Sequence, residues 1–545
     1  MSETYKSETL EHLGLVAGMF DELGIGELVD ELVPQDLEQR KISVGQALKA
    51  MVLNGLGFAN RRLYLTTRFF QNKPTGRLLG EGIEPEHLND DALGKALDDL
   101  YAYGVSELYM KIAARAAARL GIIPKVAHMD TTSFHVDGEY NSDEPPDEDS
   151  KLIHITQGYS RDRRPDLNQV VLELITENQA SLPMMMHPLS GNSSDKATFE
   201  HSVHTHIAHL QANHGLTLMV SDSAGYTRAS LEAYQQQGVH WIMSVPGTLK
   251  EAKGHLAEAE PTTMHDLAEG YRYTPMRSHY AEVEQRWLVI YSEQARTRAL
   301  KSVDKELLKQ SQQDHKAFEK LCRTRFNCPE DAERALAAYQ KTLKILRVHE
   351  VGITPHKHFA SAGRPRKDAV PDAISYHVSG ALVATVSQRE SLITKRSCFI
   401  LATNNLDEDD LSDADILAEY KGQEHVERGF RFLKDPMFLA STLFLKKVER
   451  IMALLMVMTV CLLVYAALEH RIRKTLKQHG AYVPDQKGKP TRRPTARWVF
   501  ELFLDVHLLT ITITADMLQT LVLNLLEELR TLLVLLGEPY ERLYS

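Results

Sequence analysis

Apolar residues recur every three or four positions along the first part of the chain, a spacing typical of amphipathic helices. The pattern is clearest in three segments: LEHLGLVAGMFDELG, SVGQALKAMVLNGLGF and LYMKIAARAAARLG. Ser43, which opens the second segment, is a candidate N-cap, because its hydroxyl can accept a hydrogen bond from the first helical turn. We therefore expect residues 1–120 to form an all-helical N-terminal domain.

Near Lys125 the pattern changes to short apolar runs separated by Gly, Asn and Pro, which is typical of strands. Three such runs predict a three-stranded meander: VAHMDTTSFHV, LNQVVLELITENQ and LPMMMHPLSGN. After them, helical stretches at 196–214 and 228–237 alternate with the strand-like runs LTLMVSD and VHWIMSVPG. Alternating strands and helices predict an α/β layer fold over residues 121–247.

Beyond Gly247 this alternation stops, and it resumes only near residue 396. The strand-like runs EQRWLVIYS and ISYHVSGALVATV flank a charged helical span over 297–348, so we expect residues 248–395 to form an inserted α+β domain. A long helix through AEYKGQEHVERGFRFLKD then returns the chain to the core, which we expect to comprise residues 121–247 and 396–470. The pattern of residues 471–545 predicts a basic linker followed by Leu-rich helices, so we expect a helical C-terminal region.

One stretch, 451–467, is close to the shortest apolar length that can cross a bilayer. We interpret it as a buried core helix, because the rest of the chain is typical of soluble proteins. The N-terminus has no signal-peptide pattern, and the four cysteines form no CxxC pair, so we expect a cytoplasmic protein without a structural zinc.

The chain has a formal net charge of −10, which by itself argues against a nucleic-acid partner. The charge is unevenly distributed, however. Acidic residues gather at 143–149 and 407–410, whereas residues 471–497 hold nine basic residues against the single acid Asp485. This basic segment is either a patch that meets phosphates or a solvated linker between helices, and composition alone favours neither.

Two aspartates stand where an α/β sheet usually carries chemistry. Asp130 lies inside a strand-like run, on the same face as His128, and Asp222 ends the apolar run LTLMVS at the carboxyl edge of a predicted strand. Taken alone, either residue is better explained by a turn or a helix cap, which is the more frequent role of an Asp at a strand end.

A third element strengthens this interpretation. In the predicted helix AEYKGQEHVERGFRFLKD, five polar or aromatic residues fall on one stripe where a structural helix would place Leu or Val: Tyr420, Gln423, Glu427, Arg431 and Lys434. A solvated face with charge pairs would explain Glu427 and Arg431 but not the tyrosine and the glutamine.

The spacing of Tyr420, Glu427 and Lys434 resembles the Tyr-Arg-Glu-Lys signature of bacterial insertion-sequence DDE transposases of the insertion-sequence-four superfamily. HMDTTSFH resembles the strand of the first Asp in that family, and VSDSAGY resembles the turn of the second. The chain departs from the signature at Gln423, which replaces Arg by a neutral amide, so we expect a weaker phosphate contact there.

The resemblance implies a ribonuclease-H-like catalytic core in which three carboxylates hold two Mg²⁺ ions, with Mn²⁺ as a substitute. Carried onto this sequence, the metal-binding and catalytic residues are Asp130, Asp222 and Glu427, and the long interval before Glu427 holds the inserted domain. Oxygen ligands of this kind suit Mg²⁺. The expected DNA-binding residues are Tyr420, Gln423, Arg431 and Lys434.

The implied function is that of an insertion-sequence transposase that binds terminal inverted repeats and catalyses Mg²⁺-dependent strand cleavage and strand transfer. Its partners would be double-stranded DNA, as repeat and as target, and a second copy of the chain in an active homodimer. We expect the helical region 1–120 to recognise the DNA ends. The alternatives are a catalytically decayed DNA-binding relative, a metal-dependent nuclease of the same fold and, from 451–467 alone, a membrane protein.

Two further motifs are weaker. The histidines between 201 and 214 fall at mixed helical angles, which favours a packed or solvated helix over a metal site. The run 362–367, AGRPRK, resembles a minor-groove hook but also fits a plain basic loop.

Overall fold

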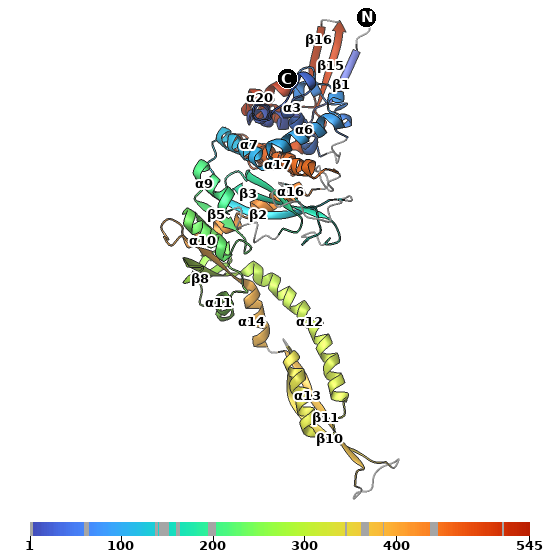
Figure 1. Cartoon of the computed structure of the whole chain (residues 1–545), viewed down its shortest axis with the longest axis vertical. Coiled ribbons are helices and arrows are strands. Elements are labelled where there is room, and N and C mark those ends of the chain that lie inside the picture. Colours follow the sequence, from blue (N-terminus) through green and yellow to red (C-terminus); the bar gives the residue numbers. More distant parts are fainter. Residues whose placement is uncertain are drawn as a thin grey trace. The chain divides into compact units, whose positions relative to one another are not determined.

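The computed structural model describes residues 4–58, 65–136, 140, 152–159, 164–193, 203–343, 346–360, 370–384, 386–435, 445–514 and 517–545. The chain folds into two compact units (Figure 1). The first comprises residues 1–243, 280–283 and 417–545, and the second comprises 244–279 and 284–416.

The N-terminal part of the first unit is built from helices that surround one long apolar helix, α17 (Val448–Gln478). The surrounding helices are α1 (Leu13–Glu22), α2 (Ile25–Leu32), α3 (Val44–Leu56), α4 (Thr66–Phe70), α5 (Thr75–Leu79), α6 (Asp90–Tyr103) and α7 (Val105–Leu120). The Ser43 hydroxyl accepts a hydrogen bond from the Gln46 amide and so caps α3, which confirms the predicted start of that helix.

Helix α17 is, within the described part of the chain, the one helix long and apolar enough to span a membrane. Its most apolar stretch is 94% buried inside the protein. It packs on α1, α3, α6 and α7. The segment 451–467 therefore lies in the core, as its pattern predicted.

The helical prediction is wrong at both ends of this unit. Residues Thr4–Thr9 form strand β1, which pairs with β15 (His507–Thr514), and β15 pairs with β16 (Met517–Leu523) in an antiparallel sheet. The sequence HLLTITIT in β15 alternates Leu and Ile with Thr, which suits a strand better than a helix. Helices α18 (Ala496–Leu502), α19 (Glu527–Leu536) and α20 (Glu538–Glu541) also lie in the C-terminal region.

The α/β part of the first unit contains five strands in the order β4-β3-β2-β5-β6. Strands β2 (Val126–His135), β3 (Gln169–Glu177) and β4 (Pro183–Ser190) form an antiparallel meander. Strands β5 (Leu218–Ser221) and β6 (His240–Ser244) continue from β2 in parallel. Helix α9 (Ala208–His214) precedes β5, and helix α10 (Arg228–Gln237) connects β5 to β6. All five strands and α10 lie where the sequence predicted them.

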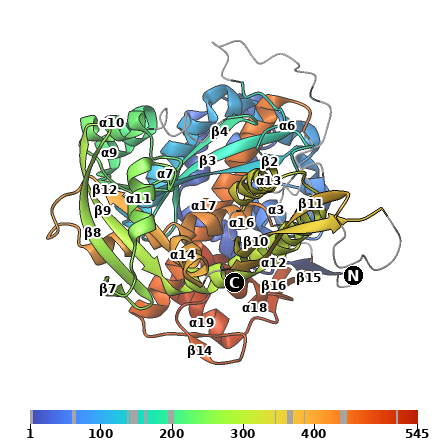
Figure 2. The same ribbon diagram turned by 90° about the horizontal axis from the view of Figure 1, so that it is seen from below.

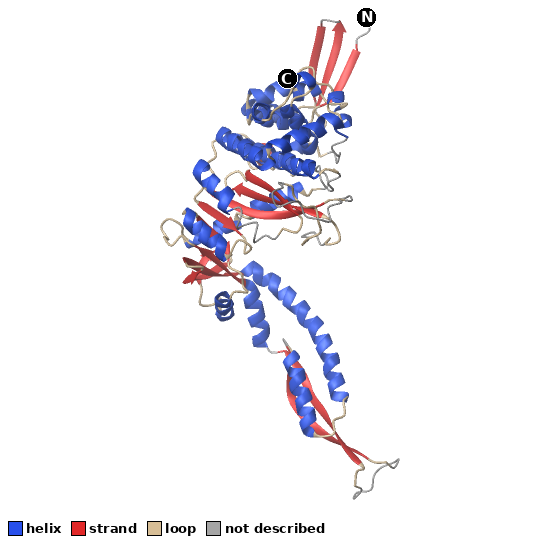
Figure 3. Cartoon of the chain, in the orientation of Figure 1, coloured by secondary structure: helices blue, strands red, loops and turns tan. Residues whose placement is uncertain are grey.

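The second unit combines strands with long helices (Figure 3). Its strands β12 (Cys398–Thr403), β9 (Val283–Ser292), β8 (Tyr271–Tyr280) and β7 (His265–Ala268) follow one another in a sheet. Helices α12 (Glu293–Arg323) and α13 (Pro329–Thr342) pack on the hairpin of β10 (Leu346–His358) and β11 (Ala373–Ala384). Helices α11 (Lys250–Glu258) and α14 (Val386–Ser397) pack on β12. The predicted helical span to residue 348 is therefore too long, because residues 346–348 already pair with β11.

Candidate active site

Asp130 and Asp222 stand side by side on neighbouring parallel strands. The register of β2 and β5 pairs Met129 with Ser221. Asp130 is the next residue of β2, and Asp222 directly follows the last residue of β5. Adjacent strands lie about 4.8 Å apart, and residues at the same register of parallel strands point to the same face. Both side chains are half-buried. The fold thus brings together two carboxylates that are far apart in the sequence.

Local hydrogen bonds orient both aspartates. Asp130 Oδ1 accepts a hydrogen bond of 2.7 Å from the Thr131 amide, and Asp222 Oδ1 accepts one of 2.8 Å from the Ala224 amide. The second bond belongs to a tight turn, in which the Gly225 amide also donates to the Asp222 carbonyl at 3.3 Å. Such an Asx turn fixes the side chain at the carboxyl end of β5.

The helix of the third carboxylate is divided into two pieces. Helix α15 (Asp413–Lys421) ends just before Gly422, and α16 (Glu424–Leu433) begins after Gln423. The predicted uninterrupted stripe is therefore wrong, because Tyr420 precedes the break while Glu427 and Arg431 follow it. Lys434 is the C-cap residue of α16.

The break coincides with a close approach to β2. A Cβ atom on Gly422 would lie 3.0 Å from Cε1 of His128, so glycine lets the junction reach the strand. At the other end of α16, the Lys434 ammonium lies 5.8 Å from the centre of the Phe134 ring. His128 and Phe134 share one face of β2 with Asp130. Helix α16 therefore runs along the face that carries Asp130, in the same direction as the strand.

These two contacts set Glu427 at about the same distance along β2 as Asp130. Along β2, Asp130 lies roughly 7 Å beyond His128 at the ordinary rise of a strand. Along the helix, Glu427 lies roughly 7 to 8 Å beyond Gly422. Helix α16 packs on β2 and β3 and beside α17 (Figure 2). Glu427 itself is exposed, so its carboxylate is open to a ligand at this face.

The predicted catalytic and DNA-binding residues thus fall into two groups by position. Asp130, Asp222 and Glu427 come from elements that meet at one face of the sheet, with Arg431 exposed and Lys434 half-buried on the same helix as Glu427. Tyr420 and Gln423 are half-buried on either side of the helix break. Gly422 and Phe134, which position α16, were not identified from the sequence. A glycine inside a polar helical pattern was the available signal for Gly422.

The donor chemistry of the three carboxylates fits Mg²⁺, which prefers hard oxygen ligands. Among the described residues, however, no group of three or more His, Cys, Asp or Glu side chains is arranged so that it could hold a metal ion. Carboxylates brought close together repel one another, and a bound cation offsets that repulsion. His206, from the predicted histidine cluster, is buried with its ring 5.2 Å from that of His187, whereas the run 362–367 lies outside the described residues.

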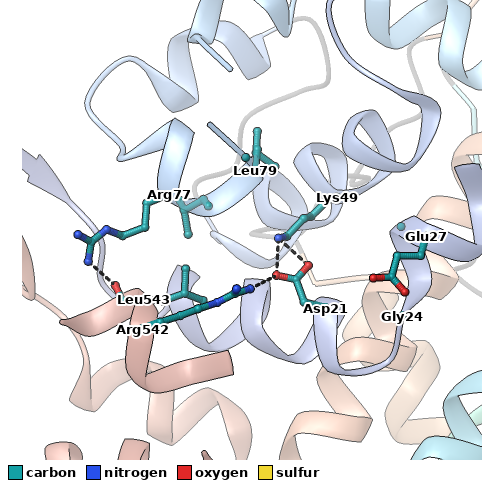
Figure 4. Close-up of a pocket in the computed structure, with 11 residues that line it drawn as sticks. Asp21, Gly24, Glu27, Lys49, Arg77, Leu79, Arg542 and Leu543 are labelled. Carbon is teal, nitrogen blue, oxygen red and sulfur yellow. Dashed lines mark hydrogen bonds and ion pairs between the residues drawn. The ribbon is translucent and has the colours of Figure 1, made fainter. Parts of the chain in front are cut away.

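A second polar site is a pocket of about 470 Å³ beside the N-terminal helices (Figure 4). Its buried Lys49 donates to Asp21 at 2.8 Å, and Arg542 lies 3.5 Å from the same carboxylate. Arg77 donates to the Ser545 carbonyl at 2.6 Å. Burial lowers the pKa of Lys49. Since Lys49 and Arg542 share the Asp21 carboxylate and Arg77 bonds to a backbone carbonyl, we interpret the pocket as part of the packing between the N-terminal helices and residues 542–545.

Two family models match the chain. Residues 5–114 match a domain of unknown function, DUF4277, and residues 124–464 match the transposase DDE domain. The second match covers more than half of the sequence. The chain belongs to the transposase DDE domain family. The predicted DDE-type transposase is thereby confirmed at the level of the family, and it implies a DNA-cleaving and strand-transferring enzyme with DNA as its partner.

No curated protein matches the chain significantly. Among solved structures, the chain is similar to the piggyBac transposase in a synaptic complex with hairpin DNA. The identity is 8%, the TM-score is 0.38, and the match covers 92% of this chain and 82% of the other.

Proposed function

We propose that the chain is the transposase of a bacterial insertion sequence of the insertion-sequence-four superfamily, which binds terminal inverted repeats and cuts and joins DNA strands. The observation that carries this proposal is the register of β2 and β5, which sets Asp130 beside Asp222 within the matched domain. The order of the five strands fits a ribonuclease-H-like core, formed by residues 121–247 and 396–470.

In this proposal Asp130, Asp222 and Glu427 would hold two divalent cations. When bound, Mg²⁺ or Mn²⁺ would supply activation of the attacking oxygen and stabilisation of the leaving oxygen. The turn after β5 would hold the Asp222 carboxylate in position, and the packing of α16 on β2 would hold Glu427 in position. Water would attack in the first cut and a DNA 3′-hydroxyl in strand transfer.

The remaining residues of α16 and its flanks would contact DNA. Arg431 and Lys434 follow Glu427 by one and two helical turns, so their charges can reach phosphates that neighbour the cut. Tyr420 and Gln423 stand before Glu427 and would add hydroxyl and amide contacts. We further propose that residues 1–120 recognise the repeat, that the active complex is a homodimer, and that the protein is cytoplasmic.

The experiment that tests this function uses the full chain and a duplex containing the DNA that flanks its coding region. With Mg²⁺ we expect strand cleavage at the end of the terminal repeat and joining to a target duplex, and with EDTA we expect neither. A duplex of scrambled sequence is the control. Binding without any cutting in Mg²⁺ or Mn²⁺ would indicate a decayed relative, and cutting without joining would indicate a nuclease.

A second test concerns Gln423, which stands where the resembled family has Arg. We expect Gln423→Arg to strengthen binding of pre-cut ends and to steepen its salt dependence by about one unit of log K per log salt, because one phosphate contact is added. Lys434→Ala should change both quantities in the opposite direction. Binding titrations between low and moderate salt measure the slopes, and unchanged slopes in both variants would show that this face meets protein rather than DNA.

A further inference from the structure

A large groove lies on the other side of α16, away from the face that carries Glu427. Its volume is about 910 Å³. Its walls come from α16, the C-terminal half of α17, the turn between β3 and β4 at 179–181, and the segment that follows the hairpin of β13 (Val483–Pro484) and β14 (Pro490–Thr491). All of these belong to the first unit.

The groove is strongly basic. Six Lys and Arg side chains line it, against the single carboxylate of Glu469: Arg428, Arg473, Lys474, Lys477, Arg492 and Arg493. Glu469 is already engaged, because it pairs with Arg473 at 2.7 Å and accepts a hydrogen bond of 2.8 Å from the Ala496 amide. Within the described part of the chain, no carboxylate pairs with Lys477, Arg492 or Arg493, and all three are exposed.

The positive charges of the groove affect the pKa of a histidine that also lines it. Burial, and then the neighbouring charges of Lys474 and Arg473, lower the pKa of His470. An imidazole so placed resists taking up another positive charge. An anion bound in the groove would offset this effect.

The floor of the groove is built from packed apolar side chains. The rings of Phe432 and Tyr465 lie 4.6 Å apart between centroids. A Cβ atom on Gly429 would lie 3.1 Å from Leu462, so this glycine lets α16 pack closely on α17. The groove therefore has a packed apolar floor and a basic rim.

The groove and the candidate active site share helix α16. Arg428 lines it and directly follows Glu427, so one helix presents the carboxylate on one face and the basic channel on the next. Lys474 and Lys477 are three residues apart on α17 and therefore share a face. We propose that this groove holds the sugar-phosphate backbone of the DNA next to the cleaved bond, an inference that rests on the proposed transposase function.

The test uses the full chain with Lys477, Arg492 and Arg493 all replaced by Ala. Since each phosphate contact contributes about 0.9 to the slope of log K against log salt, loss of three contacts should reduce that slope by about 2 to 3 units. We also expect binding of pre-cut duplex to weaken at least roughly tenfold at about 0.1 M salt. Fluorescence anisotropy without divalent metal measures binding separately from cleavage.

The matched control removes the same charge from α12, where Lys301, Lys305 and Lys309 are exposed. Their replacement by Ala should leave the slope unchanged, and an equal fall would overturn the assignment, as would an unchanged slope in the groove variant. Should the triple variant fold poorly, Lys477→Glu alone tests the same contact. In the folded wild type, added DNA should raise the pKa of His470, followed by NMR, and an unchanged value would contradict the proposal.

The outcome separates this inference from the function on which it rests. A chain that cuts its ends while the groove variant keeps the wild-type slope would refute the groove alone. Groove-dependent DNA binding by a chain that never cuts would refute the transposase function and leave the groove. Preferential binding of an acidic polypeptide over duplex at equal salt would refute the DNA assignment.

Discussion

Replacement of Glu427 by Gln is expected to reduce strand cleavage at least roughly 1,000-fold, which corresponds to about 4 kcal/mol of transition-state stabilisation. The change keeps the size of the side chain and one acceptor oxygen, replaces the other oxygen by an NH₂ donor, and removes the charge. Glu427 is exposed, so its loss of charge should not disturb packing. Cleavage of a pre-bound DNA end under single-turnover conditions measures the effect, with end binding measured in parallel.

Glu424→Gln is the matched control, because Glu424 is exposed and stands in the first turn of the same helix. We expect this variant to cut at the wild-type rate within a factor of about three. Equal losses in the two variants would mean that the charge of the helix, rather than the carboxylate of Glu427, is what matters.

Removal of the Tyr544 side chain should have the largest effect on stability, about 3–5 kcal/mol for Tyr544→Ala. The side chain is 3% exposed, and its ring fills a space above α1 that a Cβ on Gly14 would enter, 2.5 Å from the ring. Its hydroxyl donates to the Glu11 carbonyl at 2.5 Å and accepts from the Leu15 amide at 3.3 Å. The truncation would therefore leave both a cavity and unsatisfied backbone groups.

Chemical unfolding of the full chain, followed by a signal from the N-terminal helices, measures this loss. Tyr544→Phe should lose only about 1–2 kcal/mol, because it keeps the ring and removes the hydroxyl. Tyr482 is 57% exposed, so Tyr482→Ala should stay within about 0.5 kcal/mol of wild type. A loss below about 1 kcal/mol for Tyr544→Ala would show that residues 542–545 do not hold the helices in place.

The sequence was informative where local pattern and tertiary structure agree. Buried strands such as β3 and β5 are apolar runs with clear breaks, and Asp222 could be recognised because it directly follows one of them. Strand β1 could not be recognised, because its partner β15 lies about 500 residues away and pairing over such a distance leaves no local signal. The short β-branched pattern of β15 was hidden among Leu-rich helices.

The details of the candidate site depend on contacts that a single segment does not encode. The break between α15 and α16 coincides with the close approach of Gly422 to His128, two residues that are distant in the sequence. Composition alone likewise could not show which basic residues of the segment 471–497 pair with acids and which line the groove. The fold pairs Arg471 with Glu22 at 3.0 Å but turns Lys477 and Arg493 into the groove.

Asp130 and Asp222 are proposed to act as charged ligands at one site, and DNA cleavage by the variants Asp130→Asn and Asp222→Asn is the sharpest test of that role. Asparagine can still accept the amide hydrogen bonds from Thr131 and Ala224, so the local fold should persist. Asp36→Asn, at a side chain that accepts from the Glu38 amide, is the control. We predict that both site variants bind DNA ends normally but cut at least roughly 1,000-fold more slowly, while the control is unaffected. Cleavage by either site variant at a rate within tenfold of wild type would show that the replaced carboxylate is not required as a ligand.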